Sequence, residues 1–399
     1  MKFALFSHVQ VPKDAAGEFD PEAEHRRFTE VLEQSELADA LGFDYVFFGE
    51  HHVSPEYSHN SSPEVLLAAL SRRTRSVRLA TGIVHISHND PIRTAERFAA
   101  IDVISGGRVE LGFGYGAEDA ETYPWLLDRN DERRERGAEA MQIAVDVLGH
   151  AGRYPGVTTE HFEYPAGNYV PHPYQRPHMP FWMSGNSTAA AQEAARRGFG
   201  LFSHSAPSAE LVRARVEAYW TQLSTEVVPT GQTINPATAA TFPGLVARSD
   251  EEALTRVRDG LDYFEYFIGQ GESRIGHTAE GYNAARSFRE SRPSPLPAKR
   301  QWMNGLTPEG GLLLGGVDSV REQIRQLDST GLDIVTFTQS FGLTRHEHAL
   351  ESLELIGREI IPEFHARHAE HVAWRAERLE RVAAPVYSSV DFPVAVAAD

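Results

Sequence analysis

Glu50, His51 and His52 form a run of three side chains that can exchange protons or bind a metal. The residues before them, 45–49, are apolar without alternation, which is typical of a parallel strand buried on both faces. Ionisable side chains are costly to bury unless they are paired, hydrogen-bonded or used, and α/β enzymes keep their chemistry at the carboxyl ends of such strands. His51 is therefore a candidate catalytic acid or base, and a structural core histidine is the alternative.

A metal site is the second chemistry that these residue types suggest. Two or three of the histidines near the ends of the first three predicted strands could bind zinc or iron together with Glu50. These histidines are His8, His51, His52, His85 and His88. Adjacent histidines on an extended segment point to opposite faces, and the first strand has no His-x-His pair. We therefore expect no metal, and we interpret His8 and Glu50 as residues that contact the substrate.

Two glycine-containing segments are candidates for binding a phosphate or a flat ring. The sequence GFGYG at residues 112–116 lacks the third glycine of a dinucleotide fingerprint, because position 117 is Ala117. It indicates either a tight turn or a close approach of backbone to a ligand. The sequence SGNS at residues 184–187 opens a predicted helix, whose first N–H groups can bind an anion. Ordinary helix capping explains those four residues equally well.

The elements that position these residues alternate regularly along the chain. Strands are predicted to begin near residues 2, 44, 77 and 108, with one capped helix between each pair, which indicates βαβ units and a parallel sheet. Later strands are predicted at residues 180–184, 199–203, 239–247 and 333–338. Polar and glycine-rich segments follow the second, third, fourth and fifth predicted strands in turn. In an open doubly wound sheet they would gather at the one point where the strand order reverses. We therefore predict a (β/α)8 TIM barrel and not an open doubly wound sheet.

Most of the chain is predicted to be one domain, residues 1–372, closed by a long helix over 346–368. The proline-rich residues 151–180 indicate a surface insertion after strand four. The aperiodic stretch at about 269–316, after strand seven, indicates a lid-like insertion. Residues 373–399 are predicted to be a C-terminal tail that packs on a partner subunit.

Composition excludes several classes of function. Lys plus Arg (38) against Asp plus Glu (56) gives a net charge of −18, which argues against binding to nucleic acid or to an anionic membrane. The chain has no cysteine, so disulfides, thiolate metal sites and cysteine nucleophiles are excluded. No signal segment or membrane-length apolar run is visible, so we expect a cytoplasmic protein.

Taken together, these pieces resemble the bacterial luciferase-like family of flavin-dependent monooxygenases. The resemblance rests on the combination of the EHH strand end, the ATG turn at residues 80–82 and the closing helix. The matching stretches are residues 1–6, 41–55, 78–116, 169–200, 316–342 and 346–364.

The resemblance implies a dimeric TIM barrel that binds reduced FMN (FMNH2) across its strand ends and activates dioxygen as a flavin peroxide. It implies that His51 is the catalytic histidine and that Gly82-Ile83 forms a non-proline cis peptide under the flavin ring. The residues implied in cofactor binding are Thr81, Gly82, Ile83, Gly114, Tyr115, Ser184, Gly185, Asn186 and Ser187. The family commonly has an arginine at the position of Tyr115, and a tyrosine donates only one neutral hydrogen bond to a phosphate.

From the resemblance we expect a monooxygenase that oxygenates a small organic substrate, with reduced flavin supplied by a separate flavin reductase. A deazaflavin-dependent oxidoreductase that transfers hydride is the first alternative, and the absence of the arginine favours it. A metal-dependent barrel hydrolase or lyase is the second. A non-enzymatic partner subunit or flavin store would leave residues 50–52 unexplained.

Overall fold

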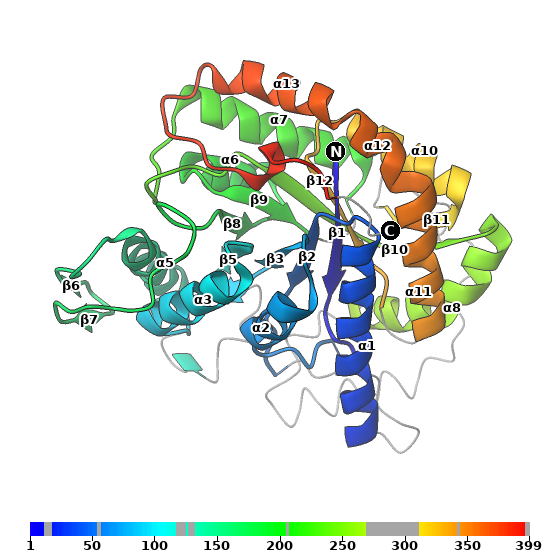
Figure 1. Ribbon diagram of the computed structural model, residues 1–399, viewed down its shortest axis with the longest axis horizontal. Coiled ribbons are helices and arrows are strands. Elements are labelled where there is room, and N and C mark those ends of the chain that lie inside the picture. Colours follow the sequence, from blue (N-terminus) through cyan, green and yellow to red (C-terminus); the bar gives the residue numbers. More distant parts are fainter. Residues whose placement is uncertain are drawn as a thin grey trace.

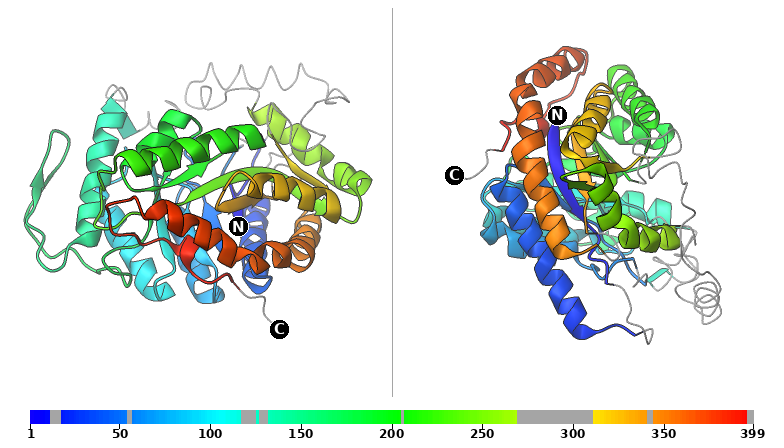
Figure 2. Two further views of the ribbon diagram at one scale, coloured as in Figure 1. Left: turned by 90° about the horizontal axis from the view of Figure 1, so that it is seen from above. Right: turned by 90° about the vertical axis from the view of Figure 1, so that its right-hand side faces the viewer.

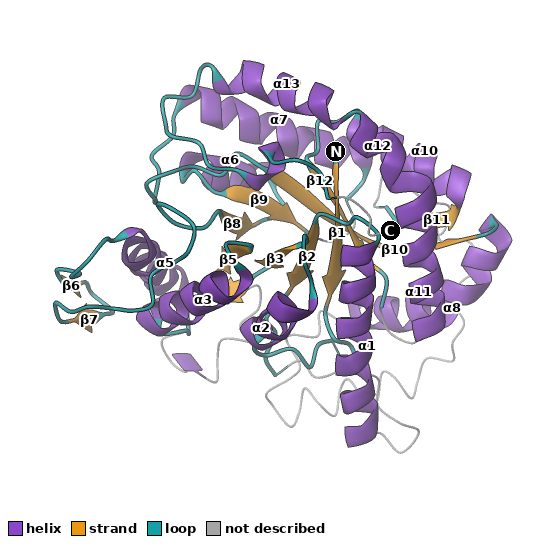
Figure 3. Cartoon of the chain, viewed as in Figure 1, coloured by secondary structure: helices purple, strands orange, loops and turns teal. Residues whose placement is uncertain are grey.

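Eight parallel strands close into a barrel, which confirms the predicted fold class (Figures 1 and 3). The computed structural model describes residues 1–11, 18–53, 57–116, 125–126, 132–204, 207–268, 311–340 and 344–395, with the backbone alone at 259 and 261–268. The barrel strands are β1 (Lys2–Ser7), β2 (Tyr45–Phe48), β3 (Arg78–Thr81), β5 (Val109–Gly114), β8 (Phe181–Ser184), β9 (Gly200–Ser203), β10 (Thr238–Ala247) and β12 (Ile334–Thr338). The barrel closes because β10 pairs with both β9 and β12, and β12 pairs with β1.

Helices surround the barrel (Figure 2). Their starts follow the signals in the sequence. Asp20 and Asp90 each cap a helix whose first residue is proline, and a left-handed glycine, Gly106, ends the second of these helices. The helices between barrel strands are α1 (Pro21–Ala40), α2 (Pro63–Arg73), α3 (Pro91–Ser105), α5 (Arg133–Gly149), α6 (Thr188–Arg196), α7 (Ala209–Thr225), α8 (Asp250–Ile268) and α10 (Val317–Asp328). Within the described ranges, no helix is long and apolar enough to cross a membrane.

The apolar run in β2 is explained by two separate cores. Tyr45 and Phe47 point into the barrel, where they join a cluster that includes Trp182 and Phe202. Val46 and Phe48 point outward into the larger core between the strands and the helices. Both faces of the strand are therefore apolar, and its first polar side chains appear where it leaves the barrel.

The C-terminal segment closes the amino-terminal end of the barrel. Val390 belongs to the interior cluster, and the hydroxyl of Ser389 hydrogen-bonds to Tyr45 at 2.7 Å. The Lys2 ammonium donates to the Ser389 carbonyl at 3.0 Å. The helix α13 (His368–Leu379) runs across the predicted tail boundary at residue 373, and packing of the tail on a partner subunit stays a prediction.

Several elements differ from the predictions. The closing helix is broken into α11 (His346–Leu355), a π turn (Ile356–Ile360) and α12 (Ile361–Ala366), because Pro362 has no N–H to continue the helical pattern. Short strands β4 (Val84–His85) and β11 (Leu313–Gly316) were not predicted, and the insertion after strand four carries the hairpin of β6 (Val157–Thr158) and β7 (Glu163–Tyr164). The predicted lid lies outside the described residues, except for 311–316.

Candidate functional site

His51 lies just past the carboxyl end of β2, half-buried among other rings. Its backbone N–H donates to the carbonyl of Asn60 at 3.0 Å, which fixes the turn after the strand. Its ring centroid lies 4.6 Å from that of Tyr57 and 5.3 Å from that of His8. The predicted catalytic histidine and the predicted substrate residue His8 are therefore neighbours. Tyr57, which the sequence reading missed, completes this group.

The two imidazoles beside His51 are held neutral. Burial, and then the charge of a protonated His51, hold the pKa of His8 well below its ordinary value. Burial likewise lowers the pKa of His204 to about 4. The hydroxyl of Tyr57 hydrogen-bonds to Nε2 of His8 at 3.1 Å. His51 therefore faces polar but uncharged neighbours near neutral pH, where a proton can be held or passed on.

Glu50 lies on the other side of the same turn and is nearly fully buried. Its Oε1 accepts hydrogen bonds from Nε2 of His52 at 2.8 Å and from the Asn89 amide at 2.9 Å, and its Oε2 accepts from the backbone N–H of His85 at 3.1 Å. Burial opposes ionisation, but the approach of His52 and His88 lowers the pKa and keeps the carboxylate charged. These hydrogen bonds fix the carboxylate in the turn after β2, and a contact between Glu50 and the substrate stays a prediction.

The peptide bond between Gly82 and Ile83 is cis, as the resemblance implied. Gly82 lies directly against the ring of Phe202, since a Cβ built there would stand 2.8 Å from two ring carbons. A Cβ built on Gly49 would be 3.2 Å from Nε2 of His51 and 3.3 Å from the Gly82 carbonyl oxygen. The Gly82 carbonyl and the imidazole of His51 therefore border the same small space at the mouth of the barrel.

Thr81 and Gly114 lie in adjacent parts of the barrel wall, where they contact neighbouring strands. The hydroxyl of Thr81 accepts from the backbone N–H of Gly112 at 2.8 Å and donates to the carbonyl of the same residue at 3.1 Å, which ties β3 to β5. The missing side chain of Gly114 leaves room that the side chain of Ile83 fills. Both residues therefore lie next to the cis peptide, and the cofactor contacts predicted for Thr81 and Gly114 stay predictions.

The first turn of α6 offers an exposed helix N-terminus. Ser187 caps the helix by accepting from the backbone N–H of Ala190 at 3.1 Å, and Asn186 accepts from the backbone N–H of His204 at 2.8 Å. Gly185 allows close packing on Ala190. The N–H groups and positive dipole end of such a turn fit a phosphate. Ser184 and Gly185 are partly buried, whereas Asn186 and Ser187 are exposed.

Tyr115 is partly buried between the barrel and α5. Its ring packs against the outer core and over Gly137 of α5, with the guanidinium carbon of Arg134 5.9 Å from the ring centre. Burial raises the pKa of its hydroxyl, so the side chain stays neutral. A contact between Tyr115 and the cofactor stays a prediction.

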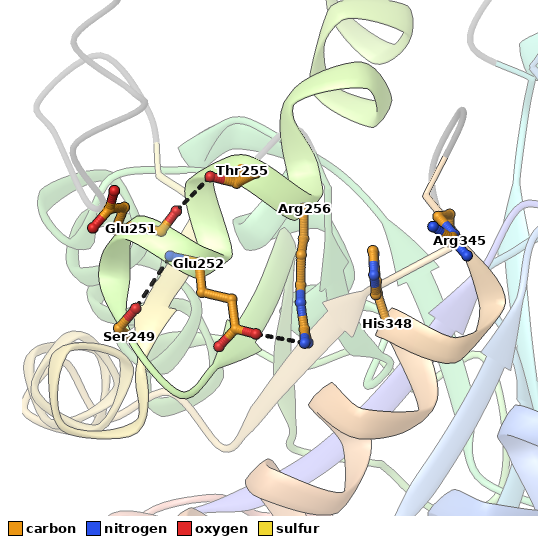
Figure 4. A pocket seen from close by; sticks show the side chains of 7 residues that line it. All are labelled: Ser249, Glu251, Glu252, Thr255, Arg256, Arg345 and His348. Carbon is orange, nitrogen blue, oxygen red and sulfur yellow. Dashed lines mark hydrogen bonds and ion pairs between the residues drawn. The ribbon is translucent and has the colours of Figure 1, made fainter.

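A pocket of about 620 Å³ lies elsewhere, between the start of α8 and α11 (Figure 4). It is lined by Ser249, Glu251, Glu252, Thr255, Arg256, Arg345 and His348. Arg256 is paired with Glu252 at 2.6 Å and with Glu351 at 2.7 Å. None of the residues predicted to carry chemistry line this pocket, so the candidate site remains at the mouth of the barrel.

Comparison with known proteins agrees with this geometry. A family model described as luciferase-like monooxygenase matches residues 1–334. The 4-hydroxyprotoasukamycin monooxygenase of Streptomyces nodosus subsp. asukaensis is 27% identical over 344 residues, which cover 84% of this chain and 86% of that protein.

Two solved structures have the same fold. The oxygenating constituent of 3,6-diketocamphane monooxygenase from Pseudomonas putida, in complex with FMN, has a TM-score of 0.68 at 19% identity and covers 91% of this chain and 98% of that one. The coenzyme F420 dependent tetrahydromethanopterin reductase of Methanopyrus kandleri has a TM-score of 0.63 at 17% identity, covering 91% of this chain and 99% of that one.

Proposed function

Because the chain belongs to the luciferase-like monooxygenase family and is an oxidoreductase of that kind, we propose that it uses reduced FMN and dioxygen to oxygenate a small organic substrate. The observation that carries this proposal is the position of His51 beside the Gly82 carbonyl, at the carboxyl ends of the barrel strands. The exposed N-terminus of α6 follows β8 at the same end of the barrel. A ring site and a phosphate site are therefore both available to one flavin nucleotide.

Each group has a defined task in this proposal. Bound reduced FMN would supply the electrons that activate dioxygen. Nε2 of His51 holds or transfers a proton next to the ring, and its neutral neighbours His8 and Tyr57 keep the imidazole in place. Phe202 and Phe6, in ring contact at 5.7 Å, form an apolar floor that keeps water from entering from below.

Hydride transfer with a deazaflavin is the second candidate function. It is supported by Tyr115, which stands where the family commonly has an arginine, and by the F420-dependent reductase among the structures of the same fold. FMN is favoured because a helix N-terminus binds a single phosphate without an arginine. A separate flavin reductase, a homodimer and a cytoplasmic location stay predictions. The separate flavin reductase fits the solved structure that is described as the oxygenating constituent of a monooxygenase.

The test compares His51→Ala with its neighbour His52→Ala. His51→Ala should bind reduced FMN normally and lose turnover by roughly 10²-fold, the usual scale for an acid or base. His52→Ala should be milder, because the His52 ring turns toward Glu50 and away from the ring site. Anaerobic titration with reduced FMN and with reduced F420 measures binding, and oxygen consumption measures turnover. Equal activity of the two variants, or tight binding of F420 alone, would overturn the proposal.

A further inference from the structure

His88 is a buried histidine whose ring nitrogens make no hydrogen bond of ordinary geometry among the described residues, although one of them approaches Glu50. Only 3% of its side chain is exposed. It follows the short strand β4, and its ring stacks on Trp125 with centroids 4.6 Å apart. A buried imidazole without a hydrogen bond is costly, so its position calls for a partner.

Nε2 of His88 points at the Glu50 carboxylate, 3.5 Å from Oε1. That distance is too long for a good hydrogen bond. The same oxygen is 2.8 Å from Nε2 of His52, and one ligand atom from each of the three residues lies within 4.8 Å of the other two. Ligands held about 2.0–2.2 Å from one ion at tetrahedral or octahedral angles stand roughly 2.8–3.6 Å apart. The measured separations from the carboxylate oxygen fall within that range.

The surroundings are suited to holding these ligands in place. Asn89 donates to Oε1 of Glu50 at 2.9 Å and the backbone N–H of His85 donates to Oε2, so the carboxylate is held on both sides. Hydrogen bonds of this kind orient metal ligands. Trp125 also packs against the His52 ring, at 4.5 Å between centroids, and shields the group from solvent.

We propose that Glu50, His52 and His88 form a binding site for a divalent transition metal such as zinc. Two imidazoles and one carboxylate suit such an ion and leave coordination positions for water. From the sequence we expected no metal because the adjacent residues His51 and His52 point to opposite faces, and in the structure they do: His51 lies beside His8, and His52 lies beside Glu50. The structure pairs His52 with the distant His88 instead. The ion fixes the turn after β2 to the turn after β4, beside His51 but separate from it.

The test uses full-length protein stripped with a chelator, with no flavin added. Equilibrium dialysis against zinc chloride gives affinity and stoichiometry, and cobalt chloride reports the site through the visible absorption of bound cobalt. Wild-type protein is expected to bind one zinc tightly. His88→Gln should weaken zinc binding by about 100-fold or more and remove the cobalt spectrum. Because flavin is absent, the result does not depend on the proposed oxygenase reaction.

The matched control is His161→Ala. His161 belongs to the other metal-like group among the described residues, with Glu139 and the exposed Glu160. This variant should bind zinc as the wild type does. Circular dichroism checks folding, and His52→Gln replaces His88→Gln if that variant does not fold. The proposal is wrong if wild-type protein binds no zinc at millimolar concentration, if the folded ligand variant binds normally, or if His161→Ala abolishes binding.

Discussion

Adding one methyl group at Gly82 should destabilise the protein through Phe202. The new Cβ would stand 2.8 Å from Cε1 and Cζ of the ring, about 1 Å inside normal carbon–carbon contact. Phe202 is fully buried, and the ring of Phe47 lies 4.9 Å away and that of Phe6 5.7 Å away, so the ring has little room to move. Overpacking of this kind costs about 1–3 kcal/mol, and Gly82→Ala should lower the free energy of unfolding by that amount.

A double-mutant cycle isolates this contact. Phe202→Leu removes ring atoms and costs stability on its own, but it opens space for the methyl group that Gly82→Ala adds. The double variant should therefore lose about 1 kcal/mol less than the sum of the two single losses. Gly167→Ala is the matched control, because a Cβ there makes only ordinary contacts at 3.6 Å and beyond with Tyr169. Its effect should stay within about 0.5 kcal/mol.

Urea unfolding followed by tryptophan fluorescence measures the wild type and all four variants. Additive losses in the cycle, or equal losses for Gly82→Ala and Gly167→Ala, would refute the account of Gly82 as a residue packed on Phe202.

Two further predictions concern the phosphate site and the C-terminal segment. Ser187→Asp keeps an N-cap oxygen but adds a negative charge, so stability should hold while the Kd for reduced FMN rises about tenfold or more. Reduced riboflavin, which has no phosphate, should bind unchanged, and an equal loss for both ligands would exclude a phosphate site. Burial, and then the charge of Lys2, lower the pKa of His368 to about 4, whereas the unfolded chain has a pKa of about 6.5 there. Between about pH 6.5 and about pH 4 the unfolded state therefore binds more protons, and the free energy of unfolding falls as the pH drops, by up to about 1.4 kcal/mol per pH unit. His368→Gln, whose amide can still donate to the Phe392 carbonyl, should flatten this dependence in urea titrations, and an unchanged pH slope would contradict the assignment.

The sequence was sufficient to predict the barrel because its signals are local. The strand β2 is a short apolar run with both faces buried, as Tyr45 and Val46 show, and each early helix starts at a cap followed by proline. Elements defined by pairing with distant strands, such as β4 and β11, have no comparable local signal. The break at Pro362 was visible in the sequence, but the helical pattern on both sides of it obscured its effect.

The candidate site was predictable only in part. The position of His51 follows from the end of β2, and the resemblance supplied the cis peptide at Gly82. Neither the strand end nor the family resemblance showed which residues each of these side chains contacts. Adjacent residues Glu50 and His51 turn to opposite sides, and His88 lies far along the chain from the carboxylate it faces. Likewise, the space beside Gly114 is filled by Ile83, which spacing alone could not show.

The most direct test of the proposed function is the reoxidation of reduced FMN by dioxygen in the presence of excess protein. Stopped-flow absorption compares free reduced FMN, the wild-type complex and the His51→Ala complex. We expect wild-type protein to delay the return of oxidised-flavin absorption, and we expect His51→Ala to shorten this delay while binding FMN equally well. Reoxidation identical to that of free FMN, together with oxygen-independent hydride transfer to or from F420, would contradict the proposed function.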